Sequence, residues 1–236
     1  MVKAVIFDLD NTLIDFLSFK QETAKAVAIE LRRHGWKLSE METYDKIFAI
    51  YQEKGIEYQK TFADLIYGEG YGGNEAEKLQ QAAIIAYNRH KYHILKPYFG
   101  VMDMLEGLRK KGLKLAVLTD APRNKAWQRL VLAGLENYFD EVGTYQDTQV
   151  HKPDKTPFLR ICEKLGVDAS DCLFVGDNPS RDIKGAKEVG MRTAWAKYGH
   201  VGQYIGYCEP NKEDEKLADF VLERPKDILK VEESGK

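Results

Sequence analysis

Short apolar runs alternate with amphipathic segments through the second half of the chain. The apolar runs, each bounded by glycine or polar residues, predict strands at residues 113–118, 141–145, 172–175, 192–196 and 219–222. Helical spacing predicts helices over 101–111, 122–133 and 156–165, one from Ser180 or Asp182 to Gly190, and a short one from Pro225. Such alternation predicts an α/β fold, a doubly wound parallel sheet with helices on both faces.

The first half of the chain has a different pattern. One apolar run, Ala4–Phe7, predicts a buried strand, and no strong strand signal follows for about eighty residues. Helical spacing instead covers residues 18–34, 39–55, 57–67 and 74–92. We therefore expect a helical domain at residues 16–96, inserted into an α/β core made of residues 1–15 and 97–236.

Local capping signals set the expected helix ends. Ser18 opens a segment that resembles a capping box, Ser39 and Asn74 precede two further helices, and Thr156-Pro157 is an N-cap followed by proline. Glycines close many of these helices, as Gly166 does after the segment 156–165. The polar stretch from Gly199 to Lys216 is expected to be a surface loop.

Composition and charge narrow the possible partners. The chain of 236 residues carries 35 basic and 37 acidic side chains, a formal net charge of −2, without blocks of like charge. This balance argues against a general nucleic-acid binder. The pattern shows no coiled-coil heptads and specifies no oligomeric state.

Cysteine usage and hydropathy indicate the compartment. Cys162, Cys172 and Cys208 have no C-x-x-C spacing, which argues against a zinc site or a disulfide framework and favours a reducing compartment. No signal peptide is expected, because Asp8 interrupts the first apolar run. No stretch reaches the roughly 18 apolar residues that a membrane span needs. We expect a cytoplasmic protein without a membrane partner.

Acidic side chains follow several predicted strands. Asp8 and Asp10 come directly after the first strand, Asp120 follows Thr119 at the end of the second core strand, and Asp177 follows Gly176. Two like charges about 4 Å apart repel by about 4 kcal/mol at a surface-like effective dielectric, so a cation or a retained proton is needed between them. Each acid alone could belong to a polar turn. Because parallel strands end at one edge of a sheet, where ligands bind, their coincidence favours a site.

These positions carry a family resemblance. Asp8-Leu9-Asp10-Asn11-Thr12, Thr119, Lys152-Pro153 and Gly176-Asp177-Asn178-Pro179-Ser180-Arg181-Asp182 match, in order, the four motifs of the haloacid dehalogenase superfamily. The resemblance covers nearly the whole chain, and each motif alone would be weak. It implies a Rossmann-like core, makes the inserted helical domain a cap, and identifies the chain as resembling the phosphatase branch.

The resemblance implies a role for each matching residue. Asp8 would be the nucleophile that forms an aspartyl-phosphate, and Asp10 the general acid and base. Lys152 would neutralise Asp8, and Thr119 would bind the phosphoryl group with nearby N–H groups, including that of Asp120. The resemblance further implies Mg²⁺ held by Asp8, Asp177 and the backbone carbonyl of Asp10.

Other positions in the motifs have less defined roles. Asp182 could adjust the metal site or orient Lys152, or it could be the N-cap of the following helix. Asn178 is a candidate supporting residue of the metal site. Thr12 fits a turn and support role better than a catalytic one. Among the histidines, none of which has metal-ligand spacing, His93 and His151 are the best candidates for substrate contacts.

The expected activity is hydrolysis of a phosphomonoester of a small metabolite. Phosphomutases share both acids and stay an alternative. A 2-haloacid dehalogenase uses the same nucleophile, but Asp10 argues against it, because in that branch the residue two after the nucleophile is not acidic. A phosphonatase would need a cap lysine that nothing singles out, and a non-catalytic binding module is a further alternative. The cap, joined at residues 15–19 and 94–99, is expected to close over the site and select the substrate.

Overall fold

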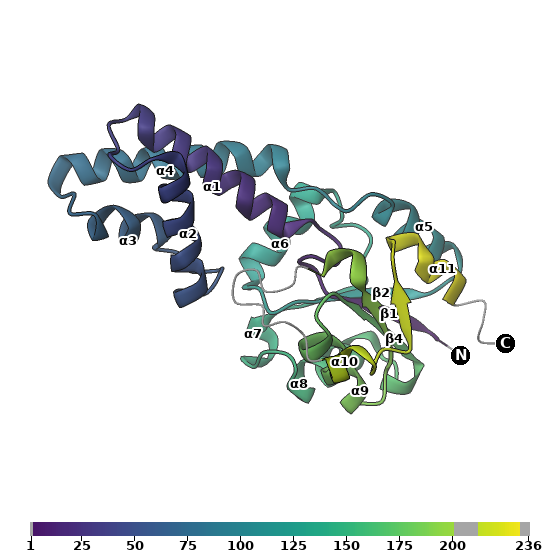
Figure 1. Cartoon of the computed structure of the whole chain (residues 1–236). Helices are drawn as coiled ribbons and strands as arrows, with labels where there is room; N and C mark the ends of the chain where they lie inside the picture. Colours follow the sequence, from purple (N-terminus) through teal and green to yellow (C-terminus); the bar gives the residue numbers. More distant parts are fainter. Residues whose placement is uncertain (1, 201–211, 232–236) are drawn as a thin grey trace. The chain divides into compact units, whose positions relative to one another are not determined.

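A computed structural model describes residues 2–200 and 212–231 (Figure 1). These residues form two compact units. One comprises residues 2–15, 96–200 and 212–231, and the other is Phe16–Leu95. We describe each unit by itself.

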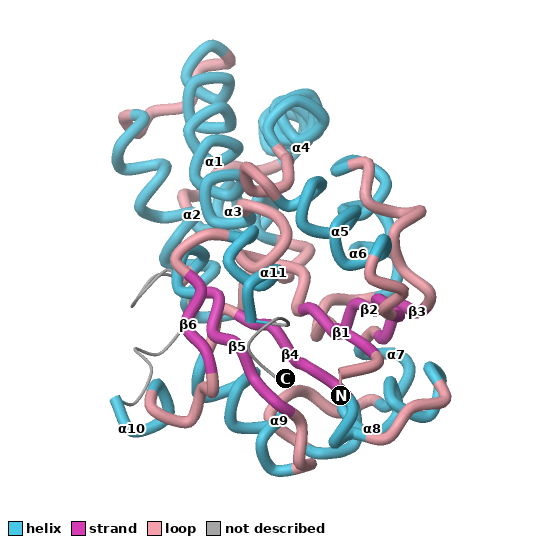
Figure 2. Tube along the Cα trace, turned by 90° about the vertical axis from the view of Figure 1, so that its right-hand side faces the viewer, coloured by secondary structure: helices cyan, strands magenta, loops and turns pink. Residues whose placement is uncertain are grey.

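The first unit is built on a parallel six-stranded sheet in the order β3-β2-β1-β4-β5-β6. Its strands are β1 (Ala4–Phe7), β2 (Lys114–Leu118), β3 (Glu141–Gly143), β4 (Cys172–Gly176), β5 (Arg192–Ala196) and β6 (Phe220–Leu222). Figure 2 shows them side by side in this order. The strand order reverses beside β1, which pairs with both β2 and β4. The predicted α/β class and doubly wound parallel sheet are therefore confirmed, and the reversal is where ligands of such sheets bind.

Strand residues alternate between the two faces of the sheet. Ala4 and Ile6 belong to an apolar cluster that also holds Phe158 and Ile161 of α8 (Lys155–Leu165). The intervening residues Val5 and Phe7 are equally buried but lie on the opposite face. Burial on both faces explains why β1 is a continuous apolar run in the sequence.

Helices cover both faces of this sheet. The helices α5 (Val101–Lys110) and α6 (Arg123–Ala133) lie on one side, while α8 and α9 (Lys184–Glu188) lie on the other (Figures 1 and 2). Short helices complete the unit: α7 (Tyr145–Thr148), α10 (Lys212–Glu215), α11 (Ile228–Val231), a π-helical turn (Pro179–Ile183), and 3₁₀ turns at Ala169–Asp171, Lys197–Gly199 and Pro225–Asp227. Helices on both faces follow from right-handed crossovers on either side of the strand reversal.

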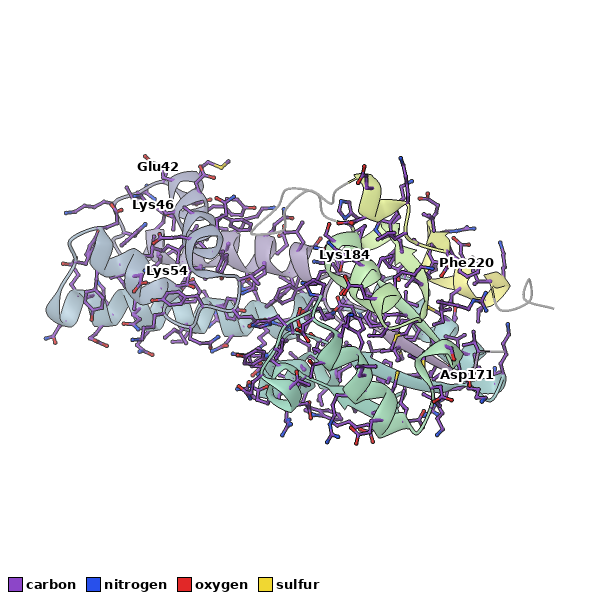
Figure 3. All side chains as sticks on the ribbon, turned by 90° about the horizontal axis from the view of Figure 1, so that it is seen from below. Glu42, Lys46, Lys54, Asp171, Lys184 and Phe220 are labelled. Atoms are coloured by element: carbon purple, nitrogen blue, oxygen red, sulfur yellow. The ribbon has the colours of Figure 1, made fainter. Side chains whose placement is uncertain are left out.

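The second unit is entirely helical. It consists of α1 (Phe16–Arg33), α2 (Glu40–Lys54), α3 (Thr61–Gly68) and α4 (Gly73–Ile94). Its core includes Trp36, Leu65 and Leu79, and the Trp36 indole donates a hydrogen bond to Thr43 Oγ1 at 2.8 Å. Lys46 and Lys54 of α2, labelled in Figure 3, form ion pairs with Glu69 and Asp64. The unit thus has its own apolar core.

Several local predictions were wrong at helix starts. Helix α1 begins before Ser18, so Ser18 is not its cap, and α4 follows Gly72 rather than Asn74. The cap of α8 is Asp154, whose side chain accepts a hydrogen bond from Thr156 N. In contrast, Ser39 forms a full capping box with Glu42.

Three further segments differ from the predictions. Residues 57–60 precede α3 rather than forming its first turn, and α7 follows β3 where a longer strand was predicted. In the predicted loop from Gly199 to Lys216, residues 212–215 form α10, while residues 201–211 lie outside the described residues. Within the described ranges, no helix combines the length and apolar character needed to cross a membrane.

Candidate active site

Asp8 stands at the carboxyl end of the central strand. Its N–H donates a hydrogen bond to Val175 O of β4 at 2.8 Å, which continues the ladder beyond β1. Asp8 is buried, and Thr12 Oγ1 lies 3.5 Å from Asp8 Oδ2 as a hydrogen-bond donor. Burial raises the pKa of Asp8 above its usual range, although Lys152 acts in the opposite direction. The fold therefore places a buried carboxylate at the strand reversal, and neighbouring cations offset part of the cost of burying its charge.

Lys152 is the main cation beside Asp8. Its Nζ lies 2.6 Å from Asp8 Oδ1 and 2.7 Å from Asp182 Oδ1, and it donates to Leu118 O at 3.1 Å. Burial alone would lower the pKa of Lys152, but Asp182 and Asp8 outweigh it and raise this pKa. Asp120 Oδ1 accepts a hydrogen bond from Lys152 N at 3.0 Å, which fixes the backbone. These short contacts hold the ammonium group as a charged partner of both acids.

Asp182 contacts Lys152 from the opposite side. Its alternative role as an N-cap is wrong, because the π-helical turn begins after Asn178, whose side chain accepts a hydrogen bond from Arg181 N. Asp182 Oδ2 instead accepts a hydrogen bond from Asn178 N at 3.1 Å. Although burial opposes ionisation, Arg181 and Lys152 lower the pKa of Asp182. Asp182 is therefore a charged partner that can orient Lys152, and Asn178 positions Asp182.

Asp177 offers the oxygens that a metal ion would need. Both of its carboxylate oxygens are buried and accept no hydrogen bond from the described residues. Asp8, Asp177 and Asp182 each have a carboxylate oxygen within 4.8 Å of the others. Burial raises the pKa of Asp177 well above its usual range, with Arg181 opposing. Hard carboxylate oxygens without donors suit Mg²⁺, so this set of ligands fits the expected ion.

The formal charges at the site also fit a divalent cation. Four carboxylates, Asp8, Asp120, Asp177 and Asp182, lie within ion-pair distance of the two cations Lys152 and Arg181. Fully ionised, this group has a formal excess of two negative charges, which equals the charge of one divalent cation. Arg181 was not singled out in the sequence, although it lies inside the fourth motif.

Asp10 has a different partner from the other acids. Its Oδ2 forms an ion pair with Arg129 of α6, and both side chains are largely buried. Among the described residues, the metal-compatible acid cluster contains Asp182 and not the Asp10 side chain, so Asp182 lies beside the expected ligands Asp8 and Asp177. The pairing with Arg129 was not predicted, because the two residues are 119 positions apart.

Thr119 directly follows the last residue of β2 and contacts both β3 and its own loop. Its N–H donates to Gly143 O at 3.0 Å, and its Oγ1 accepts from Ala121 N at 3.1 Å. Since Lys152 Nζ contacts the carbonyl of Leu118, the preceding residue, Thr119 belongs to the same edge of the sheet as Asp8. The buried hydroxyl is thereby fixed by the turn that follows β2.

Two histidines lie near the acids. His151 Nδ1 is 3.7 Å from Asp120 Oδ1, and its ring stacks on Tyr145. His200 Nδ1 is 3.3 Å from the carbonyl oxygen of Asp177, which also accepts a hydrogen bond from the Trp195 indole at 3.0 Å. The other candidate, His93, belongs to α4 of the helical unit. Trp195 and His200 had no local signal, since both act on a backbone carbonyl.

Comparison with known proteins identifies the family. Residues 5–196 match the family model described as haloacid dehalogenase-like hydrolase, and this range contains all four motifs. The chain belongs to this family. The resemblance inferred from the motifs is thereby confirmed.

Individual relatives match over nearly the full length. The chain is 32% identical over 233 residues to a glyceraldehyde 3-phosphate phosphatase of Methanopyrus kandleri, covering 98% of this chain and 97% of the relative. It is 28% identical to a phosphoglycolate phosphatase of Aquifex aeolicus, covering 98% and 96%. A solved structure of a phosphatase of the same family from Thermococcus onnurineus has a TM-score of 0.64 at 28% identity, covering 98% and 97%. All three relatives are named phosphatases, and each matches this chain over nearly its whole length.

Proposed function

We propose that this enzyme is a Mg²⁺-dependent phosphatase that hydrolyses a small phosphorylated metabolite through a phosphoenzyme on Asp8. The main support is the buried Asp8 carboxylate held 2.6 Å from Lys152, with Asp177 beside it offering two carboxylate oxygens that accept no hydrogen bond within the described part of the chain. Full-length relatives named as phosphatases support the reaction class. A carboxylate nucleophile divides a very slow hydrolysis into two easier steps.

In the first step, an Asp8 oxygen bonds to phosphorus as the bond from phosphorus to the ester oxygen breaks. Asp10 gives its proton to the departing alkoxide. In the second step, Asp10 takes a proton from water, whose oxygen attacks phosphorus and releases Asp8 and inorganic phosphate. Lys152 offsets the negative charge gathered on Asp8, while the Thr119 hydroxyl and N–H groups of its loop, including that of Asp120, bind the phosphoryl oxygens.

The acids of the site would hold Mg²⁺. Asp8 and Asp177 would bind it directly, with the backbone carbonyl of Asp10 as a further ligand by family resemblance, and Asp182 and Asn178 support the site. When bound, Mg²⁺ supplies positive charge that offsets the phosphate dianion. The excess of negative charge in the fully ionised cluster supports this contribution.

Substrate selection belongs to the helical unit in this proposal. The names of the relatives suggest short phosphorylated metabolites, so glyceraldehyde 3-phosphate and phosphoglycolate are the first substrates to test. We propose that Phe16–Leu95 acts as a cap that closes during turnover. Limited proteolysis at the joints near residues 15 and 96, with and without tungstate, tests closure; unchanged cleavage contradicts it. The described free thiols, Cys162 and Cys172, fit a cytoplasmic enzyme.

Phosphate release with and without metal tests the reaction. Purified enzyme should release inorganic phosphate from p-nitrophenyl phosphate and from a panel of small phosphate esters with Mg²⁺, and EDTA should abolish it. Transfer of phosphate to a second position of a sugar phosphate, without release, would instead indicate a phosphomutase. Metal-independent turnover of 2-chloropropionate would indicate a dehalogenase.

The nucleophile has its own test. Asp8→Asn should lower kcat by at least about a thousandfold, because the amide is a poor nucleophile. Asp171→Asn is the matched control: Asp171 precedes β4 at the end of the strand opposite Asp177 and pairs with Lys3, so its loss should leave kcat unchanged. Phosphatase activity of D8N close to that of the wild type would overturn the assignment of Asp8.

A further inference from the structure

Arg181 is surrounded by acids on several sides. Its guanidinium nitrogens lie close to four carboxylates: Asp182 at 3.4 Å, Asp177 at 3.6 Å, Asp8 at 3.7 Å and Asp120 at 3.8 Å. Three of these acids form the metal-compatible cluster. One cation therefore acts on every carboxylate of that cluster at once.

The contacts of Arg181 differ in kind from those of Lys152. Lys152 is fully buried and lies 2.6 and 2.7 Å from its two acids, the distances of charge-assisted hydrogen bonds. Arg181 lies at 3.4–3.8 Å, and its side chain is 24% exposed. Arg181 Nη2 donates a hydrogen bond to Asp182 Oδ2 at 3.5 Å, and the distances to the other three acids give Coulombic attraction spread over several carboxylates. The position is held from the backbone, where Arg181 N donates to Asn178 Oδ1 at 3.1 Å.

A divalent ion bound in this cluster would place its positive charge beside the same carboxylate oxygens that Arg181 faces. Like charges this close repel, and the repulsion is strong in a partly buried site. By linkage, a cation that interacts more favourably with the ion-free cluster than with the loaded one weakens ion binding by that difference in free energy. Arg181 is partly exposed and so has a route toward solvent, whereas Lys152 is enclosed between Asp8 and Asp182.

We propose that Arg181 is a built-in counter-cation of the acid cluster, which stabilises the carboxylates before metal binding and sets a lower affinity for Mg²⁺. The inference rests on the proposed function, because it takes Mg²⁺ as the ion of this site. Arg181 thus determines the Mg²⁺ concentration at which the enzyme is loaded. Without Arg181, the formal excess of negative charge in the cluster rises from two to three.

Calorimetric titration of Mg²⁺ into EDTA-stripped protein without substrate tests the proposal. Arg181→Gln should bind Mg²⁺ about tenfold more tightly, within the 5–150-fold range that is usual for coupled sites. Arg181→Lys keeps the charge and should stay within about twofold of the wild type. Arg160→Gln is the matched control, because Arg160 pairs with Glu163 on the exposed face of α8. The Mg²⁺ affinity of this variant should equal that of the wild type.

Thermal unfolding gives a second measurement. In EDTA, R181Q should unfold at a lower temperature than the wild type and R160Q. Millimolar Mg²⁺ should raise the unfolding temperature of R181Q to that of the wild type. Equal or weaker Mg²⁺ binding by R181Q, equal tightening in R181K, or an R181Q protein that fails to fold even with Mg²⁺ would overturn this inference alone. A wild-type protein that binds no Mg²⁺ would overturn the proposed cofactor, and this inference with it.

Discussion

The pairing of Asp10 with Arg129 gives the proposed general acid–base residue a fixed partner. Arg129 projects from α6, which follows the second core strand, and both side chains are largely buried. A buried ion pair contributes little net stability compared with an apolar pair, but removing one partner leaves an uncompensated charge. Arg129 therefore acts on the reaction through the position of Asp10.

Arg129→Gln tests this positioning role. The variant should lower kcat by about 10²-fold with a smaller change in KM, because a misplacement of about 1 Å can cost that much while the phosphate-binding groups stay in place. Steady-state kinetics on protein with a confirmed melting transition measures the split.

Two further variants control the Arg129 experiment. Arg129→Lys keeps the charge and should recover part of kcat, but not all, because it lacks the planar fork of guanidinium. Arg123→Gln removes another arginine of the same helix, one that pairs with Asp147 at the surface, and should keep kcat. Wild-type kcat in folded R129Q would contradict the role of Arg129.

At the level of single residues, motifs predicted the acids that follow strands and the cation Lys152, but not the two arginines that pair with these acids, Arg129 and Arg181. Asp8, Lys152 and Asp177 could be proposed because each occupies a fixed place after a strand or beside a proline. Arg129 could not, because its partner lies 119 positions away and an arginine on an amphipathic helix usually faces solvent. Its significance depends on tertiary packing alone.

At the level of elements, the end of β4 and the turn after it approach very closely. A Cβ added at Gly176 would lie 2.5 Å from Asp182 Cβ and 2.7 Å from Asp182 Oδ2. Only glycine therefore lets the π-helical turn fold back so that Asp182 reaches Lys152. This contact explains the glycine of the fourth motif by space rather than by backbone conformation.

Gly176→Ala should displace Asp182 and lower kcat by about 10²-fold, with a loss of stability of about 1–3 kcal/mol from overpacking. Gly107→Ala is the control: its added Cβ would meet the ends of the Leu229 side chain at 2.9 and 3.1 Å, which can move. The control should keep kcat. Kinetics and urea unfolding on both variants measure the two effects, and an active G176A would contradict the tight contact.

Asp147 joins three helices. Its carboxylate accepts hydrogen bonds from Thr144 N and Lys164 Nζ, both at 2.8 Å, and from Arg123 of α6. Burial opposes its ionisation, but the hydrogen bonds from Lys164 and Thr144 outweigh this and lower its pKa to about 2. The folded state thus favours the ionised form.

An acid whose pKa is lower in the folded state than in the unfolded state stabilises the fold at pH values above its unfolded pKa. This stabilisation is lost as the pH falls through the folded pKa. For Asp147 the loss should occur between about pH 4 and pH 2. Asp147→Asn should lower the unfolding free energy by about 1–2 kcal/mol at pH 6, and the difference should disappear near pH 2. Urea unfolding across this range measures it, with the exposed Asp103→Asn as control; a difference independent of pH would contradict the charge-based explanation.

Element types were more predictable than their starts. Helix ends at Gly134 and Gly166 were correct, because a left-handed residue there strongly favours glycine. Starts at Ser18, Asn74 and Thr156 were wrong, since several neighbouring residues can cap a helix and tertiary packing selects one. Strand β3 is short, and α7 begins almost directly after it. The periodic pattern of this stretch was therefore too short to show where the strand ends and the helix begins.

For the whole molecule, alternation of strands and helices predicted a parallel sheet but not which strands are neighbours. The reversal beside β1 is what brings Asp8 between Leu118 of β2 and Val175 of β4. Sequence motifs implied that arrangement only through family resemblance. The charge excess of the site also appears only at this scale, since the overall net charge of −2 gives no sign of it.

Mg²⁺ should stabilise the whole protein, because a ligand that binds only the folded state adds free energy to it. At a concentration of about 100 times Kd the gain is about 2.7 kcal/mol, or about 5–10 °C in Tm for a chain of this size. Burial raises the pKa of Asp177, with Arg181 opposing, and also that of Asp8, against the effect of Lys152. Protons therefore compete with the ion at these acids.

The sign of the pH effect follows from these raised values. An acid with a raised folded pKa costs stability as pH rises above its unfolded pKa and through the folded one, so the metal-free protein should lose Tm as pH rises. The increase in Tm that Mg²⁺ causes should accordingly be larger at pH 8 than at pH 5. Differential scanning calorimetry with EDTA or Mg²⁺ measures both. Asp177→Asn should lose the increment at both pH values; an increment that D177N retains would show that the stabilising ion binds elsewhere.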